Sequence, residues 1–576
     1  ILVSPHNPSR LYFASYRVWK SENRGDEWEA ISGDLTRNEE RITLPIMGRQ
    51  QSWDNAWDVG AMSNYNTITS LAESPVQEGL LYAGTDDGFI QVTENGGGSW
   101  KKIPVTALGL PERAFVNDIK ADLYDAHTVY VALDNHKEGD YRPFLYKSTD
   151  KGMTWKSISS NLPNRTLVWR MVQDPVKANL LFAATERGVY TSLNGGSSWQ
   201  KLPGTPTISF RDLTIQKREN DLVAASFGRG FFVLDDYSAL REFTSDNLSK
   251  EGKLFQPRPA KWFVQRSNVG NTGADYYFAK NPDFGAVFTY HLASDYKTQK
   301  TLRQAREKEL NQAAKNIPFP GWDALDAEKE ELPAQVILTI EDEQGNVINK
   351  VKQKASKGSH RIVWNLEHFN PFAISLNGRS RRGGGALATP GTYQASLYLD
   401  QEGTLSKLDG PIPFEVKSIR EGVLKGATHQ AYNAFRTDLT SFVKQISKVQ
   451  DEFEVSKKKA KALATAADRS KLAPGIIEPK LAALKAAITS VDKLLGGSPS
   501  KDEIGERNPA GVQTYLYGAF DGMGNTYGPT AVHKNSLVIA KSMLLKVEAA
   551  VEQLTNTMIP EIEAALEAAD APYIGN

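Results

Sequence analysis

The stretch TENGGGSW at residues 93–100 is the main indication of the fold of this protein, because its pattern recurs three more times in the chain. The other copies read SENRGDEW at 21–28, STDKGMTW at 148–155 and SLNGGSSW at 192–199. The shared pattern is [ST]-x-[DN]-x-G-x-x-W, which we call the box. Each box follows a β-rich stretch such as LLYAGT at 80–85. Self-similarity of this kind indicates a repeated β unit.

The box residues are expected to fold a hairpin turn. The third residue has a side-chain oxygen that can accept backbone N–H bonds across the turn, and the glycine supplies a positive φ. The tryptophan ring is expected to pack between neighbouring sheets. We therefore interpret the third residues and the tryptophans as structural and not as a catalytic set. They are Asn23, Trp28, Asn95, Trp100, Asp150, Trp155, Asn194 and Trp199.

The repeat resembles the Asp-box, or BNR repeat (bacterial neuraminidase repeat), which pins the last hairpin of a β-propeller blade. The similarity narrows to the sortilin-like propeller proteins of bacteria through AGTDDG at 83–88, DYRPFLYK at 140–147 and LFQPRPA at 254–260. The resemblance runs from residue 1 to about residue 420. It implies a large exported protein of a kind often labelled glycosyl hydrolase, located in the periplasm, at the cell surface or in the medium.

The resemblance also implies that the propeller begins upstream of Ile1. The first residue is not Met and no signal-peptide pattern follows it, so we expect the chain to be cut from something longer. Residues 1–245 are then the C-terminal blades of a propeller whose ring is incomplete without the upstream chain. An open ring exposes sheet faces and edges. We therefore expect the protein's own N-terminal propeller portion, attached or cleaved, to be a partner.

After the propeller the sequence pattern changes twice. Period-two alternation in AQVILTI at 334–340 and RIVWNL at 361–366 predicts an immunoglobulin-like or fibronectin-like β-sandwich over residues 246–420. A charged, helix-prone insertion near 302–332 interrupts it. Residues 421–576 show a helical period and predict a helical bundle. The predicted fold class is a multidomain, mainly β protein: β-propeller blades, then a β-sandwich, then an α-helical bundle.

The spacing of the boxes directs attention to two insertions. Successive box tryptophans are 72, 55 and 44 residues apart, so the first two intervals carry extra chain, and insertions in a propeller lie on its faces. Aromatic side chains with polar neighbours in these insertions are typical of peptide and glycan contacts. We select as binding candidates Trp53, Trp57, His136 and Tyr141. The alternative is that Trp53 and Trp57 plug the propeller.

Two arginines recur at one position of the repeat and are further binding candidates. Arg170 and Arg211 precede equivalent inner strands, as does Asp118. Such side chains are expected to line the central channel or one face, and the alternative is that they form ion pairs between blades. No catalytic residue is identified, because nothing in the sequence places two carboxylates at the separation that glycoside hydrolysis requires.

The composition excludes several kinds of site. The 68 basic and 68 acidic residues cancel, which gives no electrostatic footprint for nucleic acid. The absence of Cys rules out thiolate chemistry, and the 8 His residues show no metal-binding spacing. We predict no cofactor and no metal site, with calcium in acidic loops left as an option. No apolar run has the length of a transmembrane segment.

Two function classes remain. In the first, the protein is not an enzyme and binds peptide or protein through its propeller, as sortilins do. It then acts as a scaffolding component of a cell-envelope or surface assembly, with other envelope or surface proteins as partners. In the second, it is a glycan hydrolase, a glycosidase whose catalytic carboxylates lie partly in the missing blades. We place the first above the second.

Overall fold

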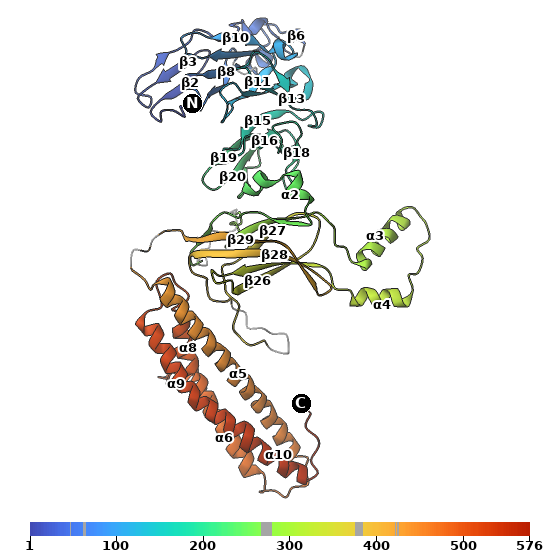
Figure 1. Cartoon of the computed structure of the whole chain (residues 1–576), viewed down its shortest axis with the longest axis vertical. Helices are drawn as coiled ribbons and strands as arrows, with labels where there is room; N and C mark the ends of the chain where they lie inside the picture. The colour runs from blue at the N-terminus through green and yellow to red at the C-terminus, as the bar shows by residue number, and fades with distance from the viewer. Residues whose placement is uncertain are drawn as a thin grey trace. The chain divides into compact units, whose positions relative to one another are not determined.

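The structure, a computed structural model, describes residues 1–46, 48–61, 65–265, 279–374, 384–420, 422 and 425–575. It divides into two compact units, Ile1–Ser249 and Lys250–Asn576. The first unit is built from β-sheets, and the second from β-sheets followed by helices (Figure 1). The prediction of a mainly β protein with a helical C-terminal region is therefore confirmed.

Among its described residues, the first unit contains five antiparallel sheets of three or four strands, which we number blade 1 to blade 5 in chain order, and one two-stranded sheet. In each blade every strand pairs with the next, which is the up-and-down order of a propeller blade. Blade 5 has three strands among the described residues. The strands are, by blade, β1 Leu2–Val3, β2 Leu11–Ala14, β3 Val18–Ser21, β4 Glu29–Ala30; β7 Ile68–Glu73, β8 Leu81–Thr85, β9 Phe89–Thr93, β10 Lys101–Pro104; β11 Phe115–Ala121, β12 Val129–Asn135, β13 Asp140–Ser148, β14 Lys156–Ser157; β15 Val168–Gln173, β16 Leu181–Thr185, β17 Gly188–Ser192, β18 Gln200–Lys201; and β19 Phe210–Gln216, β20 Asp221–Ser226, β21 Phe231–Leu234.

Neighbouring blades are joined by shared apolar cores. Tyr82 and Ile90 of blade 2 pack with Val116 and Ile119 of blade 3, and all four side chains are buried. The close approach depends on Gly84, because a Cβ there would lie 2.3 Å from Cγ1 of Val116. Equivalent cores join blade 1 to blade 2, blade 3 to blade 4, and blade 4 to blade 5. Burial of these side chains is the main favourable contribution to the stability of the unit.

The strand pairing gives each blade two different ends. The box hairpins lie at one end, the box face, beside the hairpins that join the first two strands of each blade; Gly96 N–H, for example, donates to the Gly79 oxygen at 2.9 Å. The opposite end, the loop face, carries the hairpins between second and third strands and the connections between blades. Both insertions lie at the loop face. Their short elements are η1 Arg41–Thr43, β5 Pro45–Ile46, β6 Arg49–Gln50, α1 Ala56–Ala61 and η3 His136–Glu138.

The second unit begins with two sheets that share one apolar core. The fully buried Trp364 lies edge-on to Tyr393 and Phe414 of the other sheet, with ring centroids 5.3 and 6.0 Å apart. The immunoglobulin-like or fibronectin-like assignment stays a prediction. One sheet holds β22 Gly252–Leu254, β24 Ala286–Leu292 and β27 Gly358–Trp364, and the other β23 Ala260–Trp262, β29 Thr404–Ser418, β28 Gly391–Gln401, β25 Gln335–Glu341 and β26 Val347–Lys354.

Helices make up the rest of the second unit. The charged insertion between β24 and β25 forms α3 Gln299–Gln312 and α4 Trp322–Glu330, joined by an ion pair of 2.7 Å between Arg303 and Glu328. The C-terminal helices pack around one apolar core that includes Phe442, Leu484 and Leu544. They are α5 His429–Ala467, α6 Glu478–Gly496, α7 Pro499–Glu503, α8 Val512–Phe520, α9 Ala531–Gln553, η5 Leu554–Met558 and α10 Ile559–Ala568. Within the part of the chain that was searched, no helix is both long and apolar enough to cross a membrane.

Candidate functional site on the loop face

The four box turns share one hydrogen-bond pattern. The hydroxyl of the first box residue accepts the N–H of the box glycine at 2.8–3.0 Å. The side-chain oxygen of the third residue accepts the N–H four positions later at 2.8–2.9 Å. Burial opposes ionisation of Asp150, but hydrogen bonds from Thr154 and Ser148 outweigh it and lower the pKa of Asp150 to about 2. The oxygens of these third residues are therefore engaged by their own turns.

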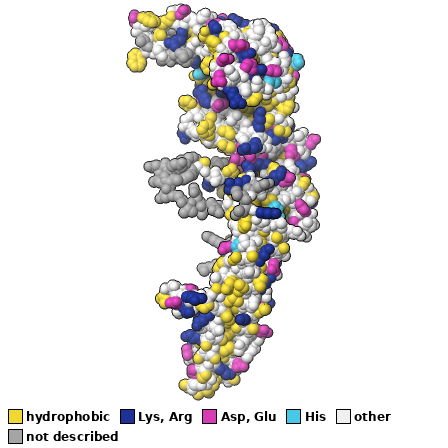
Figure 2. Space-filling view, turned by 90° about the vertical axis from the view of Figure 1, so that its left-hand side faces the viewer, with side chains coloured by type: hydrophobic (Ala, Val, Ile, Leu, Met, Phe, Trp, Pro, Cys, Tyr) yellow, Lys and Arg dark blue, Asp and Glu magenta, His cyan; other side chains and the backbone are white. Residues whose placement is uncertain are grey.

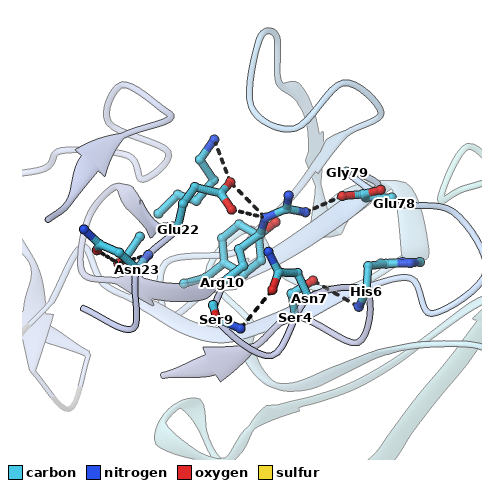
Figure 3. A network of polar contacts seen from close by, with 12 residues as sticks. Ser4, His6, Asn7, Ser9, Arg10, Glu22, Asn23, Glu78 and Gly79 are labelled. Atoms are coloured by element: carbon cyan, nitrogen blue, oxygen red, sulfur yellow. Dashed lines mark hydrogen bonds and ion pairs between the residues drawn. The ribbon is translucent and has the colours of Figure 1, made fainter. Parts of the chain in front are cut away.

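Figure 3 shows the neighbourhood of the first box. Arg10 Nε donates to Glu22 of the box at 2.9 Å, and its Nη1 donates to Glu78, in the β7–β8 hairpin, at 2.5 Å. These contacts join blade 1 to blade 2 at the box face. Ion pairs of this kind at a protein surface stabilise it by about 1 kcal/mol or less. The network is a contact between blades, and the candidate binding residues lie at the opposite end of the blades, the loop face.

Two box tryptophans are fixed to the blade before their own. Trp199 is 3% exposed, and its Nε1 donates to the Ile158 oxygen at 2.7 Å. Trp100 Nε1 donates to the Ile31 oxygen at 3.0 Å in the same way. Trp155 packs into the core shared by blades 2 and 3. These three rings are packing elements between sheets.

Trp28 differs from the other three. Its side chain is 39% exposed, its Nε1 donates to the Gly25 oxygen of its own turn, and its ring lies edge-on to Phe13. Trp28 therefore departs from the expected packing between two sheets, since among the described residues its ring contacts its own blade.

On the loop face, one side chain from each of blades 3, 4 and 5 contacts the next, and together the three form a row. His136 of blade 3 lies edge-on to Trp169 of blade 4, with ring centroids 5.8 Å apart. The guanidinium carbon of Arg211, in blade 5, lies 3.6 Å from the Trp169 ring centroid. His136 is held from behind by a short hydrogen bond to the buried carboxylate of Asp134. The structure thus brings together two of the sequence candidates, His136 and Arg211, through a residue that the sequence analysis did not select.

Trp169 is fixed in this row by its indole nitrogen. Its Nε1 donates to Glu186 at 2.9 Å, and Glu186 also accepts from the Ser209 hydroxyl at 2.8 Å. Trp169 is 7% exposed, so its contribution is a rigid support and not a free surface. The sequence did offer a signal for Trp169, because this residue lies directly before the candidate Arg170. It was missed because this tryptophan belongs to no box.

The strand pairing corrects the expectation that Arg170 and Arg211 share one position of the repeat. Arg170 follows the bulge of β15, as Asp118 and Asp212 do in β11 and β19. Arg211 lies at the bulge itself, the position of Trp169. The Nη1 of Arg170 is 3.0 Å from Asp118 of blade 3, which is 1% exposed, and its Nε is 3.0 Å from Asp212 of blade 5. Burial opposes the charge of Arg170, but these carboxylates outweigh it and raise its pKa. Arg170 thus lies in an ion-pair network between three blades, as in the structural alternative, and not in the row.

The remaining candidates lie in the insertions and are open to solvent. Trp53 is 79% exposed, and Trp57, in α1, is 90% exposed, so neither plugs the propeller in this structure. Tyr141 is 43% exposed, and the guanidinium of Arg165 lies 5.6 Å from its ring centroid. Large aromatic side chains that are exposed to solvent on the loop face are suited to stacking on a ligand.

A buried carboxyl group on the same face has a shifted pKa. Asp86, between β8 and β9, is 6% exposed and accepts the Thr67 N–H at 2.8 Å. Burial raises its pKa to about 6. The next residue, Asp87, is fully buried and bonded to Thr85 and to the Arg37 N–H. Asp86 therefore has the properties of a proton donor near neutral pH; no sequence signal shows this, because burial causes the shift.

The shift at Asp86 predicts a pH-dependent stability. Because its pKa in the folded protein is raised, the folded state binds more protons and loses stability as pH rises from about 4 through 6. Asp86→Asn keeps the acceptor for Thr67 and removes the charge. We expect the variant to be more stable than the parent by about 2 to 3 kcal/mol at pH 7.5, with little difference at pH 4. Urea unfolding at both pH values measures this, with the exposed Asp54→Asn as control; an equal difference at both values contradicts it.

Within the described residues, no group of three or more His, Asp or Glu side chains is placed to hold a metal ion. Figure 2 shows acidic, basic and hydrophobic side chains interspersed over the visible side of the molecule.

No family model matches the chain. Among curated proteins, it is 26% identical over 149 residues to Xyloglucanase Xgh74A of Acetivibrio thermocellus, a match that covers 22% of this chain and 18% of that protein. It is 27% identical over 143 residues to a xyloglucanase of Paenibacillus sp., covering 23% of this chain and 14% of the relative. The matched stretches thus span less than a fifth of these relatives.

Two solved structures that match parts of the chain are distant from it in sequence. A GH74 xyloglucanase from Xanthomonas campestris is 14% identical, with a TM-score of 0.28 over 39% of this chain and 33% of that chain. YCF48 from Cyanidioschyzon merolae is 13% identical, with a TM-score of 0.28 over 41% of this chain and 69% of that chain. Parts of this chain are thus similar to xyloglucanases in sequence.

Proposed function

We propose that the loop face of the first unit binds a polysaccharide and that the chain is part of a glycoside hydrolase. The observation that carries this is the row of His136, Trp169 and Arg211, contributed by three consecutive blades. A row that crosses blade boundaries suits an extended ligand, since blades 3 and 5 present His136 and Arg211 at successive positions and the buried Trp169 of blade 4 supports both. The sequence similarity to xyloglucanases supports a glycan over a peptide. This reverses the order of the two functions expected from the sequence.

Asp86 is our proposed proton donor for glycosidic bond cleavage. A general acid in a glycosidase is a carboxyl group whose pKa is raised, so that it is still protonated when the substrate binds. Asp86 meets this condition, and Lys137 of the next blade lies close enough to influence its charge. The second carboxyl group that hydrolysis requires is not assigned. We propose that the complete site also uses the N-terminal propeller portion, and that the protein works outside the cytoplasm.

Binding is tested with the three exposed aromatic residues. We expect the triple variant Trp53→Ala, Trp57→Ala, Tyr141→Ala to bind a xyloglucan oligosaccharide at least about tenfold more weakly, because stacking area is lost. Its melting temperature should stay within a few degrees, since the side chains are exposed. Isothermal titration calorimetry and a thermal melt measure the two effects. Trp28→Ala, an exposed aromatic change on the box face, is the matched control.

A protein-binding scaffold remains the second candidate function. Apolar side chains at the two ends of the blade series favour it: Phe13 is 45% exposed in blade 1, and Phe231 is 77% exposed in blade 5. Such surfaces are typical of faces that another sheet covers. Release of reducing ends from a glycan panel separates the two functions. Binding of glycan without release would support recognition alone, and absence of both would favour the scaffold.

A further inference from the structure

The loop face of blades 3 to 5 carries a set of exposed basic side chains. We call it the basic patch, and among the described residues none of its members forms an ion pair within 4.0 Å. Three of them lie over aromatic rings: Lys137 over Phe115, Arg165 over Tyr141 and Arg211 over Trp169. The members are Lys137, Arg165, Arg187, Arg211 and Arg229.

Arg211 is the best-positioned member of the patch. Its guanidinium lies 3.6 Å from the Trp169 ring centroid and 5.3 Å from that of Phe227. The ring of Trp169 is fixed in its orientation, because its indole N–H donates to Glu186, which also accepts a hydrogen bond from the Ser209 hydroxyl. Stacking occupies the flat faces of a guanidinium and leaves its N–H edge free to bond in the plane. Arg211 is thus oriented before any ligand arrives.

Three carboxylates close to this row are already engaged. Asp212 pairs with Arg170, Asp134 with His136, and Glu186 accepts from Trp169 and Ser209. The guanidinium of Arg211 therefore faces solvent without a neutralising partner among the described residues, whereas Arg170 is neutralised by two carboxylates. A planar N–H edge with this freedom matches a carboxylate, which can accept two parallel hydrogen bonds from it.

We infer that the basic patch binds the carboxylate of an acidic sugar, a uronic acid unit within the polysaccharide, with Arg211 as its anchor. This rests on the proposed function and narrows it from a glycan in general to a glycan with carboxyl groups. Trp169 positions Arg211, and the exposed ring of Tyr141 offers a surface to the sugar ring itself. An acidic peptide would present the same carboxylate chemistry, but the similarity to glycan-active proteins favours the sugar.

The test compares four probes on the full chain by calorimetry: trigalacturonate, its carboxyl-reduced neutral form, a neutral xyloglucan oligosaccharide and a glutamate-rich peptide. We expect trigalacturonate to bind at least about tenfold more tightly than its reduced form, and this preference to fall as salt is raised. Arg211→Ala should weaken trigalacturonate binding about 10- to 100-fold, the range for a charged hydrogen-bonded contact. Arg211→Lys should recover only part of this, because the planar edge is lost.

Arg218→Ala is the matched control, since Arg218 lies in the same blade at the opposite end, is 80% exposed and pairs with Glu219. It should change trigalacturonate binding less than twofold. Neutral oligosaccharide binding without a preference for trigalacturonate would overturn the inference and leave the proposed function intact. Binding of a glutamate-rich peptide with the same Arg211 dependence, and of no sugar, would overturn both. Full recovery of binding by Arg211→Lys would overturn the role of the planar edge.

Discussion

Trp199→Ala is expected to lower the free energy of unfolding by about 3 to 5 kcal/mol, the range for removal of a large ring from a packed core. The ring is 3% exposed, and its indole nitrogen donates to the Ile158 oxygen of the preceding blade at 2.7 Å. The substitution removes this bond as well as the packing, and it leaves a buried carbonyl with one partner fewer. Urea unfolding, monitored by circular dichroism, measures the change.

Trp28→Ala provides the internal comparison. The same box residue in blade 1 is 39% exposed and bonds only within its own turn, so we expect a cost of about 1 kcal/mol or less. If the two variants lose equal stability, the contribution of a box tryptophan comes from its turn and not from the neighbouring blade. If neither loses stability, the rings do not hold the blades together.

Arg241→Ala is expected to cost about 3 to 5 kcal/mol at pH 7, because it leaves a buried charge without its partner. Arg241, in η4 Ser238–Glu242, donates to both oxygens of Asp174 at 2.8–3.1 Å. Asp174 is fully buried. Burial disfavours its charged form, but the bonds from Arg241 and Tyr237 outweigh burial and hold the pKa of Asp174 below its usual range.

The pH dependence of this effect has a defined sign. A lowered pKa contributes stability that is present above the pKa of the unfolded chain and is lost as pH falls through the folded value. The difference between parent and Arg241→Ala should therefore shrink as pH falls below about 4. Urea unfolding at pH 7 and at pH 3.5 measures it. Arg218→Ala, which removes an exposed arginine, should cost less than about 0.5 kcal/mol at either pH; a constant difference for Arg241→Ala contradicts the assignment.

The features of this protein that depend on local interactions could be predicted from its amino-acid sequence. The box pattern specifies a turn whose bonds run between residues two to four positions apart, as Asn95 and Ser99 illustrate at 2.9 Å, so four copies predict four similar hairpins. Alternation and helical periodicity likewise predicted a β-rich region followed by helices, because the period of apolar residues follows directly from the backbone geometry of each element.

Tertiary contacts separate residues that look alike in the sequence. The strand pairing places Arg170 at the position of Asp212, and Arg211 at the position of Trp169. Arg170 is neutralised by Asp118 and Asp212, whereas Arg211 stacks on Trp169. Those partners come from neighbouring blades. The pKa of Asp86 is raised because the folded chain buries its carboxyl group away from water. Contacts across blades and the loss of water around a side chain depend on residues distant in sequence, which no local pattern records.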